Sequence, residues 1–284
     1  MLSEFFRHVE RTGAPMLRPL ARFFACLVFV GLAVAAAPHG AFCQERLGVV
    51  LLHDKNEHPE KQLDELERQL RNTGFSVLVP EMPWSRRRGF DATYQQALLE
   101  IGLAVEELRL GGATQVALVG HGLGANAALG YAASRGGVCG LVALAPSHDP
   151  ERHREVFLPD VRKARNLLST NGRTARSLFT DIAQDKDYDL STTAEVYLSF
   201  NDPDGAAVMP RSCAALKSPL PLLWVVGLGD PLRHLGRAYA FSKAPAHRMS
   251  RYEEVEADHA GVPKKASRLT AEWLRDMVCA PACP

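Results

Sequence analysis

The sequence lacks an excess of charge of either sign, and this bears on the partners it can have. Its 33 lysine and arginine residues are nearly balanced by 32 aspartate and glutamate residues, giving a formal net charge of +1. Proteins that bind nucleic acid usually carry a strongly basic face, so the composition argues against a nucleic-acid partner. Internal repeats and low-complexity tracts are also missing, which argues against a repeat architecture.

The sequence also lacks an apolar run long enough for an ordinary transmembrane helix. Arg18 and Arg22 precede an unbroken apolar stretch at 23–37, and small residues follow it. This stretch is shorter than the roughly 20 residues needed to span a bilayer, which disfavours the rival interpretation of a permanent anchor. We therefore predict a secretory signal peptide at 1–43, a periplasmic or secreted protein, and no stable membrane span after cleavage.

Single residues refine this prediction. Either Met1 or Met16 can be the start, because the segment from Met16 already provides an adequate positively charged lead-in. Phe42 stands before Cys43, where a lipidation signal needs a small residue. We therefore expect no lipid anchor at Cys43.

The cysteines and histidines show no metal-ligand spacing, so the sequence predicts no metal site and no cofactor. Export would bring the cysteines of the mature chain into an oxidising compartment. Cys279 and Cys283 are close enough in sequence for a local disulfide, whereas Cys139 lies in an apolar segment and is expected to be a small buried hydrophobic residue.

From residue 47 onward, short apolar runs alternate with helical patterns, which indicates an α/β fold with a mostly parallel sheet and helices on both faces. We interpret 44–284 as a single domain. A helix is expected after Pro59, ending at Gly74, and the clearest helical stripe runs from Tyr94 to Leu108. Strands are expected at 47–53, 75–79, 115–119, 138–145, 222–226 and 252–256.

The alternation fails between residues 146 and 219. Helical patterns at 156–168 and 175–183 predict a helical insertion or cap over the carboxyl edge of the sheet. Because pocket shape depends on how this segment folds, the sequence does not identify a substrate.

The strand at 115–119 runs directly into Gly120-His121-Gly122-Leu123-Gly124 and a helix of small residues. This arrangement resembles the nucleophile elbow of the α/β-hydrolase superfamily, in which a nucleophile stands at the centre of a Gly-x-Ser-x-Gly turn. Here the central position, Gly122, carries no nucleophile.

Other positions extend the resemblance over residues 47–278. Asp230 follows a late strand and matches the family's acid, and His259 follows the last strand and matches its base. His53 matches the histidine of the family's His-Gly oxyanion loop, although Asp54 replaces the glycine. The resemblance implies that Asp230 and His259 occupy the positions of the family's catalytic acid and base.

Glycine at 122 excludes the usual acyl-enzyme route, because glycine has no oxygen or sulfur that can attack an acyl carbon. The sequence contains no second Gly-x-Ser-x-Gly or Gly-x-Cys-x-Gly, and the loop residues Ser85 and Ser147 are weak candidates for a relocated nucleophile. We expect His53, His121 and Leu123 to contact a ligand. The basic run at 86–88 is either a solvated loop or a binding site for a carboxylate or phosphate.

Three hypotheses follow. In the first, the chain is a degenerate hydrolase that binds a small-molecule ligand or a partner. In the second, it is an active hydrolase on an ester-like substrate, using Asp230 and His259 as a base for water, or a relocated nucleophile. In the third, it is an envelope-associated structural protein that uses the scaffold to present the insertion.

Overall fold

A computed structural model describes residues 46–170, 174–184 and 186–279 of the chain. The chain divides into two units, Met1–Cys43 and Gln44–Pro284, and the following description concerns the second. The predicted signal peptide and the possible disulfide between Cys279 and Cys283 lie outside the described residues and side chains.

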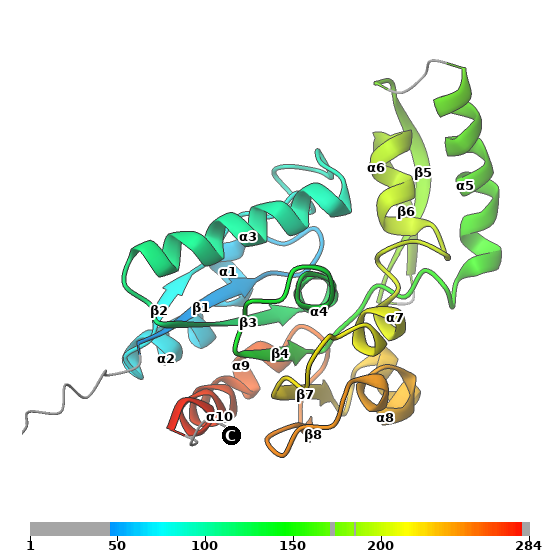
Figure 1. Cartoon of the computed structure of the whole chain (residues 1–284). Helices are drawn as coiled ribbons and strands as arrows, with labels where there is room; N and C mark the ends of the chain where they lie inside the picture. The colour runs from blue at the N-terminus through cyan, green and yellow to red at the C-terminus, as the bar shows by residue number, and fades with distance from the viewer. Residues whose placement is uncertain (1–45, 171–173, 185, 280–284) are drawn as a thin grey trace, which may run out of the picture. The chain divides into compact units, whose positions relative to one another are not determined.

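The second unit is built on a parallel sheet of six strands in the order β2-β1-β3-β4-β7-β8 (Figure 1). Every neighbouring pair in this sheet is parallel, so all the carboxyl ends meet at one edge. The strands are β1 (Leu47–Leu52), β2 (Ser76–Leu78), β3 (Gln115–His121), β4 (Gly140–Leu144), β7 (Leu222–Gly227) and β8 (Arg251–Val255). All six predicted strands are present, with ends that differ by a few residues.

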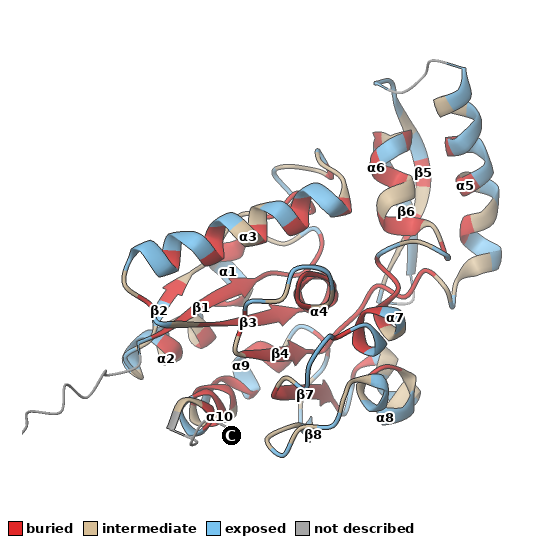
Figure 2. Cartoon of the chain, viewed as in Figure 1, coloured by how far each residue is buried: buried red, intermediate tan, exposed pale blue. Residues whose placement is uncertain are grey.

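Helices cover both faces of the sheet, as the sequence predicts. One face packs against α3 (Tyr94–Leu110) and α4 (Leu123–Ser134), and the other packs against α2 (Asp64–Asn72) and α10 (Ser267–Cys279). Strand β1 shows how the two cores are divided, because Val50 and Leu52 face the first and Val49 and Leu51 face the second. A strand covered on both faces is apolar throughout, and Figure 2 shows β1, β3 and β4 as buried ribbons.

The remaining short helices connect these elements. The helix expected after Pro59 is two helices, because the chain breaks at Leu63, the residue shared by their caps. The connecting helices are α1 (Pro59–Gln62), α8 (Gly236–Tyr239), α9 (Val262–Lys265) and two 3-10 turns, η1 (Pro231–Leu235) and η2 (Phe241–Lys243).

The insertion between β4 and β7 contains helices, as predicted, but it also contains a hairpin that was not predicted. It contains α5 (Arg154–Ser169), an antiparallel hairpin of β5 (Arg176–Ala183) and β6 (Lys186–Thr193), α6 (Ala194–Asn201) and α7 (Met209–Ala214). The segment predicted as a helix at 175–183 forms β5. Its alternating buried residues are Phe179 and Asp181, and the buried charge at 181 conceals the two-residue period that would identify a strand.

Among the residues that the structure describes, no helix is both long and apolar enough to cross a membrane.

Candidate functional site

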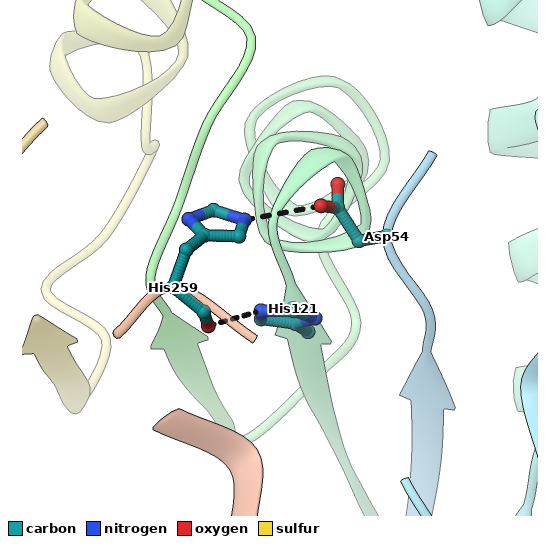
Figure 3. Close-up of side chains that lie close together, drawn as sticks. All are labelled: Asp54, His121 and His259. Carbon is teal, nitrogen blue, oxygen red and sulfur yellow. Dashed lines mark hydrogen bonds and ion pairs between the residues drawn. The ribbon is translucent and has the colours of Figure 1, made fainter. Parts of the chain in front are cut away.

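The candidate site lies at the carboxyl edge of the sheet, where segments far apart in the sequence meet. Asp54 follows β1, Gly122 follows β3, and His259 follows β8. Figure 3 shows Asp54 and His259 facing each other, with His121 beside them at the end of β3. Because parallel strands deliver their carboxyl ends to one edge, the topology alone brings these residues together.

Gly122 has the backbone conformation of a nucleophile elbow. Its φ is +55° and its ψ is −120°, between β3 and the first turn of α4. Gly124 allows the close packing of this turn, because a Cβ there would lie 2.5 Å from the carbonyl oxygen of Leu52. A Cβ built on Gly122 itself would overlap the carboxylate of Asp54. The space for a nucleophile's side chain is therefore filled by a carboxylate from another strand.

The Asp54 carboxylate also receives the backbone donors that flank the elbow. Its Oδ1 accepts hydrogen bonds from the N–H of Leu123 and the N–H of Lys55, each at 2.7 Å. In hydrolases with this elbow, the N–H after the nucleophile and an N–H from another loop form the oxyanion hole. Asp54 therefore places a negatively charged oxygen where such a hole would hold the oxyanion.

Asp230 and His259 are brought together, as expected for an acid and base pair. The Nδ1 of His259 donates to Oδ2 of Asp230 at 2.8 Å, and Oδ1 of Asp230 accepts from the N–H of Leu232 at 2.8 Å. On its other side, Nε2 of His259 donates to Oδ2 of Asp54 at 3.0 Å. Both ring nitrogens of His259 are therefore bonded to carboxylates.

These bonds set the charge of the pair. Burial lowers the pKa of His259, but the hydrogen bonds to Asp230 and Asp54 outweigh it and raise this pKa to about 10. Burial opposes ionisation of Asp54, yet the hydrogen bond from His259 and the nearby histidines hold the pKa of its carboxyl below the usual range. At neutral pH the ring is an imidazolium between two carboxylates, and it has no lone pair with which to accept a proton.

His121 is fully buried beside His259, with their ring centroids 4.9 Å apart. Its Nε2 donates to the backbone carbonyl of His259 at 3.0 Å, while its Nδ1 has no hydrogen-bond partner among the described residues. Burial lowers the pKa of His121 to about 4, so the ring is neutral at pH 7.

Lys55 ties this site to the insertion. Its buried Nζ donates to the Asp181 carboxylate at 3.0 and 3.2 Å and to the backbone carbonyl of Ile182 at 2.8 Å. It also lies 3.2 Å from Nδ1 of His148. Asp181 accepts a further bond from Tyr188 on β6. The hairpin is thus held over the site by a buried ion pair to the residue that follows Asp54.

Little free volume remains at the site. A cavity of about 20 Å³ adjoins Asp54, and its walls include Ser147, His148, Ile182 and Gln184. This volume holds about one water molecule.

Other residues predicted from the sequence have structural contacts. Both ring nitrogens of His53 form hydrogen bonds with the backbone. Nδ1 donates to the carbonyl of Asp54 at 2.7 Å, and Nε2 accepts from the N–H of Met82 at 3.0 Å. Leu123 contributes its N–H to Asp54. The hydroxyl of Ser85 donates to Glu81.

In the basic run at 86–88, Arg87 and Arg88 have acidic partners within the same part of the chain. Arg87 pairs with Glu81, and Arg88 pairs with Asp91 and Glu100. These pairs favour the interpretation of a solvated loop over that of an anion site.

Sequence reasoning missed Asp54 as a site residue, and with it Lys55, His148 and Asp181. Asp54 stands out only as an aspartate where the hydrolase pattern has glycine. Asp54 and Gly122 are far apart in the sequence, so no local sequence pattern predicts that they lie next to each other in the fold.

Comparison with solved structures supports the fold, whereas comparison of the sequence with known families and curated proteins found no match. A monoacylglycerol lipase from Paleococcus ferrophilus is 20% identical, with a TM-score of 0.57 over 81% of this chain and 94% of that one. A monoglyceride lipase variant from Saccharomyces cerevisiae is 14% identical, with a TM-score of 0.57 over 82% and 87%. A structure described with the metagenome-derived lipolytic enzymes LipS and LipT is 14% identical, with a TM-score of 0.58 over 83% and 95%.

Proposed function

We propose that this chain, which has the α/β-hydrolase fold, is an exported hydrolase-like protein that has lost acyl-transfer chemistry and binds a small-molecule ligand or a partner. One observation carries the proposal: the carboxylate of Asp54 occupies the space of the missing side chain on Gly122 and accepts the backbone N–H groups at the elbow. An acyl substrate needs that space for its carbonyl carbon and oxygen.

The electrostatics of the site support the same conclusion. A negative oxygen at the elbow repels the oxyanion of a tetrahedral intermediate, whereas catalysis requires donors that are free to receive it. In a triad enzyme, loss of the nucleophile alone lowers turnover by a factor of about 10⁶. Here Asp54 fills the oxyanion hole, and the nucleophile is also absent. Both the attacking group and the stabilisation of the oxyanion are therefore missing.

The alternative of a water-activating base at His259 is disfavoured by the contacts of that ring. A general base must reach the proton it abstracts and accept it on a free nitrogen. Both nitrogens of His259 instead donate to carboxylates. Activity by this route would require Asp54 to leave its position.

Fluorophosphonate labelling and ester hydrolysis test the proposal. We expect no labelling and no turnover of short-chain esters by the wild-type protein. Gly122→Ser should also be inactive, because Asp54 fills the site, whereas Gly122→Ser combined with Asp54→Gly should gain labelling at residue 122. Labelling of any serine in the wild-type protein would overturn the proposal.

Export is tested separately. Expression of the full chain in a bacterial host, followed by fractionation and N-terminal mass spectrometry, should yield a mature protein that begins near residue 44 in the periplasm or medium. An intact N-terminus in the cytoplasm would contradict this part of the proposal.

A further inference from the structure

Three donor groups from different segments meet where the nucleophile is missing. A carboxylate oxygen of Asp54, a ring nitrogen of His121 and a ring nitrogen of His259 lie within 4.8 Å of one another (Figure 3). All three residues are buried, with exposed fractions of 5%, 0% and 3%. Two imidazoles and one carboxylate form a ligand set that suits zinc and other divalent transition-metal ions.

His259 has the surroundings of a metal ligand. Its Nδ1 donates to the Asp230 carboxylate at 2.8 Å, which fixes the ring and directs Nε2 toward Asp54. In proteins, a metal-ligating histidine usually donates its other ring N–H to a carboxylate or a backbone carbonyl. Asp230 can therefore act as the outer partner of a histidine ligand.

His121 is held in a similar way by a backbone carbonyl. Its Nε2 donates to the carbonyl oxygen of His259, so in the neutral ring that burial favours, Nδ1 carries a lone pair. That nitrogen has no hydrogen-bond partner among the described residues. A buried polar atom without a partner is costly, and a metal ion or a water molecule would relieve that cost.

Charge balance favours a cation over a water molecule. Asp54 and Asp230 bring two negative charges to the buried site, and a single proton on His259 offsets only one of them. A divalent ion in place of the proton between His259 and Asp54 would balance both carboxylates, because the imidazole then binds as a neutral ligand.

The distances also suit an ion. Donors on one tetrahedral zinc ion lie about 3.3 Å apart, given bonds of about 2.0 Å. Nε2 of His259 and Oδ2 of Asp54 are already 3.0 Å apart, and a ring nitrogen of His121 lies within 4.8 Å of a donor atom on each of these residues.

We propose that Asp54, His121 and His259 bind one divalent transition-metal ion of the zinc class. Three protein donors leave a coordination position open for water or for an anionic group of a small-molecule ligand. This inference rests on the proposed function. The ion would bind in the space of the missing nucleophile's side chain, and it would use the imidazole of His259 that would otherwise activate that nucleophile.

Zinc titration of the EDTA-treated protein, followed by calorimetry and elemental analysis, tests the site. We expect one zinc ion per chain in the wild-type protein, with binding weakened roughly tenfold or more in Asp54→Asn, His121→Gln and His259→Gln. His247→Gln is the control, because His247 is a half-buried histidine outside both the donor set and the cavity beside Asp54, and its zinc binding should be unchanged. Absence of stoichiometric binding, or equal binding by all variants, would overturn the proposal.

X-ray absorption of the zinc-loaded wild-type protein gives an answer that does not depend on the variants folding. We expect a shell of nitrogen and oxygen atoms with the scattering of two imidazoles, and a sulfur ligand or a single imidazole would contradict the assignment. The two proposals fail differently. Loss of zinc binding without fluorophosphonate labelling removes only the metal site, whereas labelling removes the proposed function whatever the zinc result.

Discussion

The carboxylate of Asp54 lies in the space toward which a side chain on Gly122 would point. The two residues follow different strands, and each departs from the α/β-hydrolase pattern at its own position. In space the departures complement each other, because glycine removes a Cβ and aspartate fills the resulting volume. The elbow geometry persists, since Gly122 keeps a positive φ, but the site now joins two carboxylates through one imidazole.

A double-mutant cycle between residues 54 and 122 measures this complementarity. Gly122→Ala should destabilise the protein by roughly 1–3 kcal/mol, because the new Cβ overlaps Asp54 and φ is positive. In the Asp54→Gly background only the cost of the positive φ remains, so the penalty should be smaller by about 1 kcal/mol or more. Urea unfolding of the four proteins provides the values. Equal penalties in the two backgrounds would show that Asp54 does not occupy this space in solution.

The sequence was sufficient to predict the parts of the fold that depend on local pattern. Buried parallel strands are apolar on both faces, so β1 and β3 were predictable, and the glycines of the elbow located the turn between β3 and α4. The prediction failed at β5, where Asp181 is buried and pairs with Lys55. A charge that is satisfied by a distant partner looks like an exposed residue in the sequence.

The site was predictable only as separate residues. Asp230, His259 and Gly122 could be identified from their order after successive strands, because parallel topology fixes where the strands end. The placement of Asp54 in the elbow depends on the path of the loop after β1 and on its bonds to Leu123 and His259. The donor set of Asp54, His121 and His259 was hidden for the same reason, since its members have no regular spacing.

Lys55 should be important for the stability of the hairpin. Lys55→Met leaves the buried carboxylate of Asp181 without its cation, and breaking a buried ion pair costs about 3–5 kcal/mol. Lys61→Met, at an exposed lysine, serves as the control and should have little effect. Urea unfolding gives the free energy, and limited proteolysis should show faster cleavage within 176–193 for Lys55→Met alone. Similar proteolysis of the two variants would contradict the ion pair's role in holding the hairpin.

Stability should fall as the pH is lowered from about 6.5 to about 4. Burial, and then the charge of Lys55, lower the pKa of His148 from 6.5 to about 4, and burial lowers that of His121 to about 4. Below pH 6.5 the unfolded chain binds protons that the folded chain does not, so its free energy falls relative to the native state, by an amount on the order of a few kcal/mol.

Chemical unfolding at several pH values measures this loss. His148→Gln removes one of the histidines whose pKa is lowered by burial, so the decline between pH 6.5 and pH 4 should be shallower than in the wild-type protein. His58→Gln, at a half-buried histidine just before α1, is the control for replacing a histidine. A wild-type stability that is flat across this range would show that these histidines are not buried in neutral form.

His259 should behave in the opposite sense, and its titration tests the bond to Asp54 directly. Its folded pKa of about 10 lies above the unfolded value of 6.5, so its contribution to stability is complete below pH 6.5 and is lost as the pH rises through 10. Asp54→Asn removes one of the two carboxylates that favour the charged ring, so the pKa of His259 should fall from about 10 toward its ordinary value of 6.5. NMR titration of the imidazole in metal-free protein measures the change. Asp202→Asn is the control, since Asp202 is a half-buried carboxylate bonded to Arg165 in the insertion, and it should leave the titration of His259 in place. If Asp54→Asn and Asp202→Asn give the same titration curve, Asp54 does not hold the proton on His259.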